Sequence, residues 1–393
     1  MFIILQLLFI ILGVPESLFC EQYPCAIPAS FSNASSTSIN NISPVLESIV
    51  KEYGVPGMVA AVISSDMVIS VGAAGLRSAS SSNKATVNDQ FHIGSDIKSM
   101  TATLMAILID KGYLKWNSKV IDVFPDLKGK IDPKYNSLDL EQLLTHRGGV
   151  NPDINYDKIQ KIAGSDLVKA RQLAMEKVLS QPPGVASGEY QYSNMGYVIA
   201  GHMAEKVTGR MWEDLLTNYL FLPLRMQSAG FGPPKNGVLE QPVGHNEEGK
   251  PLGDGPSADN PQTIGPAGTV HLTILDWAKY IMMHLRGARG NNCLLSKSFF
   301  EKLHTSISNP PPAYAMGWMV VSPKWADGNV LVHAGSNTYW LAKVWIAPKK
   351  DLAILVACNK GGKDGQAACN QAGLILMQNQ LNLPHVKSID PTH

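Results

Sequence analysis

The chain has 393 residues, of which 45% are hydrophobic and 17% charged, a balance typical of a folded globular protein with a sizeable core. Its 33 basic and 32 acidic residues give a formal net charge of +1. This near-neutral balance argues against a nucleic-acid or other polyanionic partner bound through bulk charge.

The first residues form a candidate secretory signal. Residues 1–20 read MFIILQLLFIILGVPESLFC, and the apolar run from Phe2 to Val14 is too short to span a membrane. The run suits the apolar region of a signal peptide although the usual basic start is missing, and an uncleaved anchor is the alternative. With cleavage after Cys20, we expect a secreted, extracellular protein that has no stable membrane anchor.

Residues 21–42 are rich in serine and asparagine and predict an exposed linker. Asn33 in NAS and Asn41 in NIS both fit the acceptor pattern for N-glycosylation, which occurs in secreted proteins. Such tripeptides also arise by chance, so each is weak support for secretion by itself.

The cysteine count permits disulfides in the mature chain. The five cysteines are Cys20, Cys25, Cys293, Cys358 and Cys369. Cleavage after Cys20 leaves four, with three possible connectivities. The short loop favours Cys358 with Cys369, which leaves Cys25 with Cys293, and buried free thiols are the alternative. Because there is no CxxC pair and the histidines are scattered, we expect no structural zinc and no cofactor.

The first folded elements alternate between helix and strand. Residues 43–54 predict a helix that begins near Ser43. Residues 57–75 form two short β-rich runs joined by a turn, the pattern of a hairpin. A second helix follows from about residue 97 and stops at Gly112, because apolar residues recur there at spacings of three and four.

The middle and the end of the chain differ in character. Residues 116–264 predict helices separated by loops rich in proline and glycine, and the irregular stretch 232–262 either is disordered or lines a site. From residue 265, four short apolar runs with turns between them predict antiparallel strands, and residues 364–381 predict a closing helix.

The expected fold class is therefore α/β, with an antiparallel sheet flanked by helices and a mostly helical inserted lobe. One domain spans residues 43–385: residues 43–115 and 265–385 make the sheet lobe, and residues 116–264 make the insertion. Residues 386–393 are a polar tail. We expect the functional site between the two lobes.

The start of the second helix carries the first candidate residues for chemistry. Ser95 and Lys98 are three residues apart and share one helix face. A serine hydroxyl becomes a good nucleophile when a neighbouring base takes its proton, and a lysine is such a base only if desolvation keeps it neutral. The alternative is a capping serine beside a solvated lysine.

Two further motifs follow at a distance. Tyr192 and Asn194 lie in YSN, which opens an apolar helix, and His333 and Gly335 lie in HAG at the end of a predicted strand. A tyrosine can relay a proton, an asparagine can hold a substrate amide, and a histidine can hold a carboxylate. Taken singly, each motif is better explained by its structural alternative: a core aromatic residue for the tyrosine, and an edge-strand residue with a satisfied hydrogen bond for the histidine.

The order of S-x-x-K, Y-x-N and H-x-G resembles the serine β-lactamase and penicillin-binding-protein superfamily. Within it, the chain is similar to the branch of class C β-lactamases, D-Ala-D-Ala carboxypeptidases and esterases, from Ser43 to Leu381. The segments that carry the resemblance are FHIGSDIKSMTATLMAILIDKGYLKWNSKVIDVFPDLK, LEQLLTHRGGV, YSNMGYVIAGHMAEKVTG, GPAGTVHLTILDWAKYI, YAMGWMV and HAGSN.

The resemblance implies a β-lactamase/transpeptidase-like fold and three catalytic residues. Ser95 would be the nucleophile that accepts the acyl group, and Lys98 would be its base or electrostatic partner. Tyr192 would move protons between Ser95, the leaving group and water.

The resemblance also implies a set of substrate-binding residues. Asn194 would orient the acyl amide, and Gly335 would let the substrate backbone approach closely. The backbone N–H groups of Ser95 and Ser336 would form the oxyanion hole. His333 stands where β-lactamases usually carry a lysine, which weakens the case for a dedicated β-lactamase.

Four other residues lie close to the motifs. Asp96 follows the nucleophile and either caps the helix or favours its dipole, while Tyr339 and Trp340 either narrow the pocket or belong to the core. His146 in LLTHRGG is expected to end a helix.

The expected function is metal-independent hydrolysis or transfer of an acyl group, through a Ser95 acyl-enzyme, on a small-molecule or peptide substrate. Peptides, amides, esters and β-lactams are all candidates, and the loops between Ala229 and Gln262 would decide among them. The alternative is an extracellular-matrix or binding component on the same scaffold, with vestigial catalysis. No acidic run or low-complexity repeat supports that alternative.

Overall fold

The computed structural model describes residues 39–234, 240–253, 255–291, 293–307 and 311–383. The expected signal (residues 1–20), the acceptor Asn33 and the tail (residues 386–393) lie outside the described residues. Asn41, the other expected acceptor, is exposed, and its Oδ1 accepts a hydrogen bond from the N–H of Ser43.

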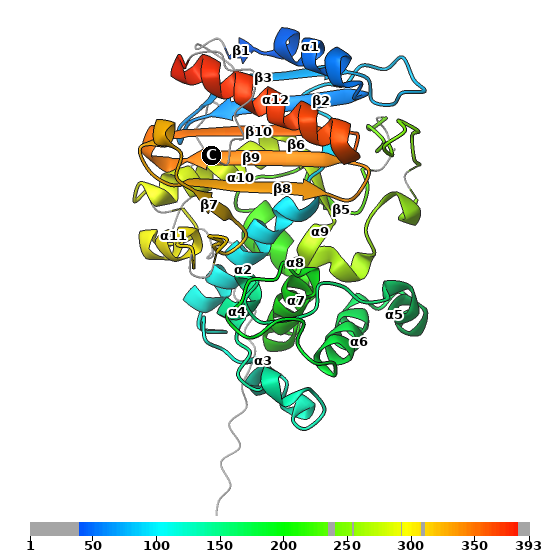
Figure 1. Cartoon of the computed structure of the whole chain (residues 1–393), viewed down its shortest axis with the longest axis vertical. Helices are drawn as coiled ribbons and strands as arrows, with labels where there is room; N and C mark the ends of the chain where they lie inside the picture. Colours follow the sequence, from blue (N-terminus) through cyan, green and yellow to red (C-terminus); the bar gives the residue numbers. More distant parts are fainter. Residues whose placement is uncertain (1–38, 235–239, 254, 292, 308–310, 384–393) are drawn as a thin grey trace, which may run out of the picture.

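A seven-stranded sheet forms the first lobe (Figure 1). In spatial order its strands are β1 (Asn40–Asn41), β3 (Val68–Gly75), β2 (Gly57–Ile63), β10 (Leu352–Cys358), β9 (Leu341–Ala347), β8 (Val330–Ser336) and β7 (Met319–Val321). All neighbours are antiparallel except β1 and β3. Since β2 pairs with β10, the two ends of the chain build one sheet. The expected antiparallel sheet with flanking helices is confirmed.

Helices cover both faces of this sheet, which explains why β2, β9 and β10 are buried along their whole length. α1 (Ser43–Tyr53) and α12 (Gly362–Leu381) contact each other and cover one face, while α10 (Ile274–Ala288) packs against β2 and β10. Within the described ranges, every helix is too short or too polar to cross a membrane.

The second lobe lies below the sheet in Figure 1 and is mostly helical. Its main helices are α3 (Val120–Val123), α4 (Leu140–Leu144), α5 (Tyr156–Ala163), α6 (Leu167–Leu179), α7 (Asn194–Thr208) and α8 (Trp212–Leu216). A small sheet of β4 (Gln90–His92), β6 (Val270–Thr273) and β5 (Gly230–Phe231) connects it to α10. The short helix α9 (Gly265–Gly268) follows the loop region, and α11 (Lys297–His304) packs on α10.

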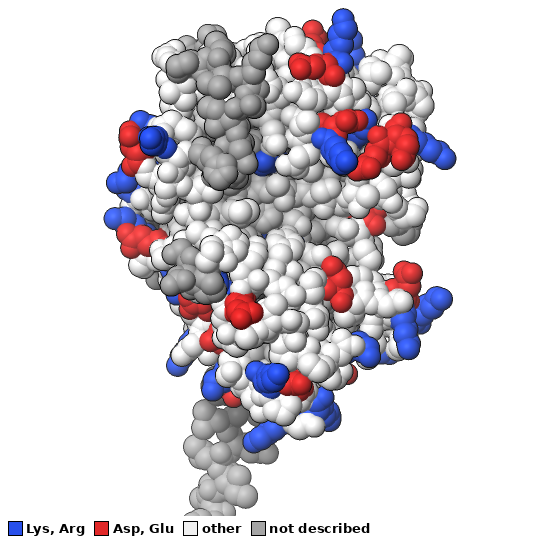
Figure 2. Space-filling view, viewed as in Figure 1, with Lys and Arg blue, Asp and Glu red and all other residues white. Residues whose placement is uncertain are grey.

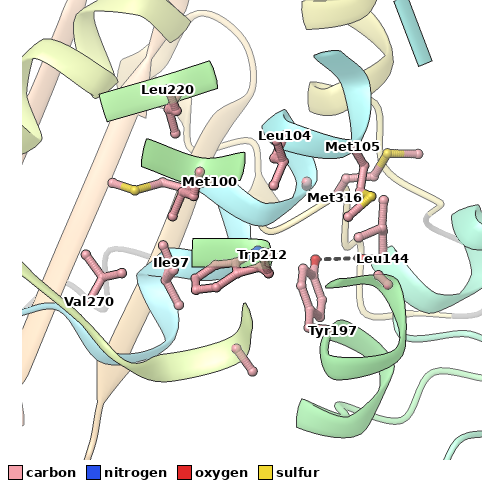
Figure 3. Packing of buried hydrophobic residues seen from close by; sticks show 14 of the residues in the cluster. Ile97, Met100, Leu104, Met105, Leu144, Tyr197, Trp212, Leu220, Val270 and Met316 are labelled. Atoms are coloured by element: carbon pink, nitrogen blue, oxygen red, sulfur yellow. Dashed lines mark hydrogen bonds between the residues drawn. The ribbon is translucent and has the colours of Figure 1, made fainter. Parts of the chain in front are cut away.

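The helix α2 (Ile97–Asp110) lies at the centre of the molecule and contacts α7, α8 and α9. Every residue from Ile97 to Leu108 is buried, so this helix is enclosed on all sides rather than on one apolar face. Figure 3 shows Met100 and Leu104 of α2 packed among aromatic and aliphatic side chains of the helical lobe. The first turn of α2 therefore lies deep in the molecule.

Figure 2 shows acidic and basic side chains interspersed over one face of the molecule. This mixture agrees with the formal net charge of +1 and offers no single-sign surface on that face.

The expected disulfide between Cys358 and Cys369 is wrong. Both cysteines are free and buried, and their sulfur atoms are 3.7 Å apart, whereas a disulfide needs about 2.05 Å. Cys369 on α12 donates a weak hydrogen bond to Cys358 at the end of β10. Cys293 is disulfide-bonded, and the expectation for Cys25 lies outside the described residues.

We expect Cys358 and Cys369 to resist alkylation in the native protein, because burial denies the reagent access to both sulfur atoms. Mass spectrometry after iodoacetamide treatment, with and without denaturant but without reductant, measures this. Both cysteines should be labelled only after denaturation. A protein that yields neither label in denaturant would contain the Cys358–Cys369 disulfide after all.

Candidate active site

Ser95 lies in a tight turn, η3 (Gly94–Asp96), that leads directly into α2. Among residues 91–100 it alone is partly accessible, and the others are buried. Gly94 has a φ of +50°, and a Cβ there would lie 2.3 Å from the backbone nitrogen of Ser336. The turn thus packs closely against β8, and Ser95 is its one partly accessible residue.

Lys98 lies one turn after Ser95, with its side chain buried. Its Nζ donates hydrogen bonds to Ser95 Oγ at 3.0 Å, Asn194 Oδ1 at 2.9 Å and Ala267 O at 2.9 Å. Burial lowers the pKa of Lys98 from 10.5 to about 7, although nearby carboxylates oppose part of this shift. The solvated-surface alternative therefore does not hold, and a sizeable fraction of the lysine is neutral near pH 7.

The YSN motif reaches the same point from the other lobe. Ser193 caps α7, because its Oγ accepts the N–H of Gly196, and this cap places Asn194 at the first position of the helix. The ring centroid of Tyr192 is 4.7 Å from Lys98 Nζ, so the phenol lies beside the lysine. Burial raises the pKa of Tyr192, so the phenol keeps its proton at neutral pH.

The HAG motif lies on β8, at the edge that faces the η3 turn with Ser95. β7 pairs only with Val330–Val332, so it does not extend along the last residues of β8. A Cβ on Gly335 would lie 1.9 Å from Ile93 O and 2.7 Å from Ser95 N. Only glycine permits this approach, and it brings Gly335 and the exposed Ser336 beside Ser95.

Gly335→Ala should lower the free energy of unfolding by at least about 1–3 kcal/mol, the usual cost of overpacking, because the new methyl group meets backbone atoms. Denaturant unfolding followed by fluorescence measures the change. Gly255→Ala is the matched control, since a Cβ there would have no atom within 4 Å. An unchanged unfolding midpoint for Gly335→Ala would contradict the close contact.

The structure gives Asp96 a role that sequence reasoning missed. Its carboxylate is buried, and Oδ1 lies 3.3 Å from His333 Nδ1. The other ring nitrogen, Nε2, lies 3.3 Å from the hydroxyl of Tyr314. Burial raises the pKa of Asp96, while the nearby His333 ring opposes the rise. His333 therefore faces a carboxyl group and is not a lone cation at the third motif.

His146, expected only to end a helix, holds the second motif in place. It follows the end of α4 with a φ of +59°, and its Nδ1 accepts the N–H of Ser193 at 3.1 Å. The centroids of the His146 and Tyr192 rings are 4.4 Å apart, and burial lowers the pKa of His146 well below 6.5. A neutral imidazole thus orients the tyrosine. The only sequence signal for it is the polar THRGG turn after an apolar helix.

The irregular stretch 232–262 contributes one carboxylate that contacts two other segments near the site. Asp259 Oδ1 lies 2.9 Å from His92 Nε2 and accepts a hydrogen bond of 2.9 Å from Asn337 Nδ2. His92 Nδ1 in turn accepts the N–H of Gly94. One side chain from the loop thus connects the turn before Ser95 with the residue after the HAG strand.

Tyr339 and Trp340 belong to the core around the site. Trp340 is buried, and its ring packs edge-on against Phe91 with centroids 5.6 Å apart. Tyr339 is partly buried against the same cluster. Of the two expectations for this pair, the structure supports the core.

The three motifs therefore converge, although Ser95 and His333 are far apart in the sequence. A buried lysine lies between a serine and an asparagine, a neutral tyrosine lies beside the lysine, and the edge of β8 lies beside the serine. This arrangement can activate a hydroxyl group and hold an acyl group against it.

Comparisons with known proteins agree with this geometry. The family model described as Beta-lactamase matches residues 42–376, which contain all three motifs. The protein named Protein flp of Staphylococcus aureus (strain N315) is 23% identical over 324 residues, which are 82% of this chain and 63% of that protein. The chain thus spans less than two thirds of that relative.

Two solved structures share the fold. The octameric penicillin-binding protein homologue from Pyrococcus abyssi superposes with a TM-score of 0.68 and 24% identity, covering 86% of this chain and 77% of the other. The class C beta lactamase from Rhodobacter sphaeroides gives a TM-score of 0.67 and 20% identity, with 85% and 98% coverage.

Proposed function

The chain belongs to the beta-lactamase family, and from this premise we propose that it is a serine hydrolase that forms an acyl-enzyme at Ser95. The observation that carries the proposal is the position of Lys98. Its buried Nζ lies 3.0 Å from Ser95 Oγ, and burial lowers its pKa to about 7. A base must be neutral and within hydrogen-bond distance of the proton it takes, and Lys98 meets both conditions.

In the proposed acylation, Ser95 Oγ gives its proton to neutral Lys98 and bonds to the substrate's carbonyl carbon. The N–H groups of Ser95 and Ser336 would stabilise the resulting oxyanion. When the intermediate collapses, the bond to the leaving group breaks, and the leaving group gains a proton through Tyr192, which Lys98 reprotonates. Water then attacks the acyl carbon and gives a proton to the same pair. The bond between Ser95 Oγ and the acyl carbon breaks, and Oγ takes a proton back from the pair, which restores Ser95.

The substrate class is an acyl compound small enough to reach a partly exposed serine: an amide, ester, peptide or β-lactam. Because His333 faces Asp96, the third motif has no isolated positive charge for the carboxylate of a β-lactam antibiotic. This supports a peptidase or esterase activity over a dedicated β-lactamase.

We also propose that the chain is secreted and acts outside the cell, on the basis of its apolar N-terminal run and the exposed acceptor Asn41. The alternative role as a matrix or binding component remains a hypothesis. The close contacts among Ser95, Lys98 and Asn194 favour catalysis over it.

Intact-mass analysis tests the enzyme proposal. The protein is incubated with a fluorophosphonate, a fluorescent penicillin or an activated ester, and any adduct is mapped by peptide digestion. An adduct on the peptide that contains Ser95 is the expected result. If all three reagents leave the mass unchanged and no ester is hydrolysed, the chain does not form an acyl-enzyme.

A further inference from the structure

We propose that Asp153 selects acyl donors that carry a protonated amine next to the reacting carbonyl group, such as aminoacyl amides or esters with a free α-amino group. This inference rests on the proposed acyl-enzyme function and specifies its substrate class.

Asp153 is held beside the residue that is expected to orient the acyl group. Its Oδ1 accepts hydrogen bonds from Asn194 Nδ2 at 3.2 Å and from the Tyr156 hydroxyl at 2.8 Å. Asn194 Oδ1 at the same time accepts from Lys98 Nζ. Asp153 thus lies one side chain away from the catalytic lysine, on the acyl side of Ser95.

The backbone of this segment is fixed. The carbonyl of Asn151 accepts the Ser193 hydroxyl at 3.1 Å, and the carbonyl of Pro152 accepts the N–H of Met195 at 3.1 Å. Both donors belong to the start of α7, which also carries Asn194. The carboxylate therefore keeps its position relative to Asn194 without any ligand.

The carboxylate still has capacity for a ligand. Asp153 is exposed, and both of its hydrogen bonds within the described residues go to Oδ1, which leaves Oδ2 open. Its negative charge acts on the site, because it is the largest of the charges that raise the pKa of Lys98. An ammonium group at Oδ2 would form a charge-assisted hydrogen bond, one of the stronger polar contacts.

The third motif does not favour an anion. His333 lies beside Asp96. The carboxyl groups of Asp96 and Asp153 both act on Lys98, whose pKa is lowered by burial. A substrate with a carboxylate would meet little positive charge, while an ammonium on the acyl side would meet Asp153. The charge distribution therefore favours a cationic acyl group and an uncharged leaving group.

The experiment compares alanine p-nitroanilide with its N-acetyl derivative at pH 7, using both enantiomers of each. The wild-type protein should have a kcat/KM for the free amine at least about 10-fold above that for the acetylated compound, since hydrogen bonds to charged groups are worth roughly this factor or more. Asp153→Asn should lower the free-amine value by about 10- to 100-fold, mostly through KM, and leave the acetylated value within about 3-fold.

Asp157→Asn is the matched control. It removes the same charge from an exposed aspartate in the first turn of α5, and it should change neither value. Equal losses for both substrates in Asp153→Asn, or no preference in the wild-type protein, would overturn the proposal.

A binding assay decides the case even without turnover. Each compound is tested for its ability to slow fluorophosphonate labelling of Ser95 in the wild-type protein. Protection by the free amine at a concentration at least about 10-fold lower than by the acetylated compound supports the proposal. Equal protection, or none, refutes it while labelling of Ser95 still upholds the enzyme proposal. Absence of labelling would refute the enzyme proposal itself.

Discussion

Ser95→Ala is expected to abolish covalent labelling and to reduce acyl transfer by about 10⁴- to 10⁶-fold, the loss seen when the nucleophile of a serine hydrolase is removed. The variant loses the oxygen atom that accepts a hydrogen bond from Lys98 Nζ and that would attack the substrate. Because Ser95 is partly accessible and a methyl group fits in place of a hydroxymethyl group, the fold should persist. Labelling by a fluorophosphonate and turnover of an activated ester measure the two losses.

Ser48→Ala provides the matched control for this variant. Ser48 is exposed on α1, and its hydroxyl donates to the carbonyl of Pro44, far from the motifs in the sequence. It should label and turn over substrate like the wild-type protein. An adduct that survives in Ser95→Ala, or turnover that falls less than 100-fold, would place the nucleophile elsewhere.

Much of the fold could be predicted from the sequence because its elements carry strong local patterns. The hairpin of β2 and β3, the late strands β8–β10 and the closing helix α12 are all bounded by turns or glycines that sequence reasoning can identify. The pairing of β2 with β10 is less local: the order of the elements predicted that residues 43–115 and 265–385 share one sheet lobe, but not which strands pair. The parallel strand β1 was missed, because two polar residues carry no strand pattern.

The motif residues could be predicted for a similar reason, but their partners could not. Ser95, Lys98, Tyr192 and Asn194 belong to short patterns with a fixed order, and the fold brings them together. Asp153 and Asp259 lie in loops, and nothing local shows which element such a carboxylate will contact.

Asp96 illustrates the limit most clearly. An acidic residue in the first turn of a helix has an adequate local explanation in the helix dipole. Its actual partner, His333, is provided by a strand that follows more than two hundred residues later. The disulfide error has a related cause, since a short separation between Cys358 and Cys369 does not fix the distance between their sulfur atoms.

The acylation rate should rise with pH, with an apparent pKa near 7. Only neutral Lys98 can accept the Ser95 proton, and burial lowers the pKa of this lysine from 10.5 to about 7. The active fraction is therefore small below pH 6 and nearly complete above pH 8. Single-turnover labelling between pH 5 and 9, with a reagent that does not titrate in this range, measures the profile. A flat profile would exclude Lys98 as the base.

Lys98→Arg tests whether Lys98 acts as a base or only as a positive charge. A guanidinium group keeps the charge but does not lose its proton in this range, so acylation should fall by about 10²- to 10⁴-fold and the rise with pH should vanish.

The stability of the wild-type protein gives an independent readout of the Lys98 pKa. Because the folded pKa of Lys98 lies below its unfolded value, this lysine binds more protons in the unfolded chain between about pH 7 and 10, and its contribution to the free energy of unfolding rises with pH there. Lys98→Met lacks this contribution. The wild-type protein should therefore gain stability relative to Lys98→Met as the pH rises from about 7 to 10. If that difference stays constant while acylation still rises with pH, the group that controls acylation is not Lys98.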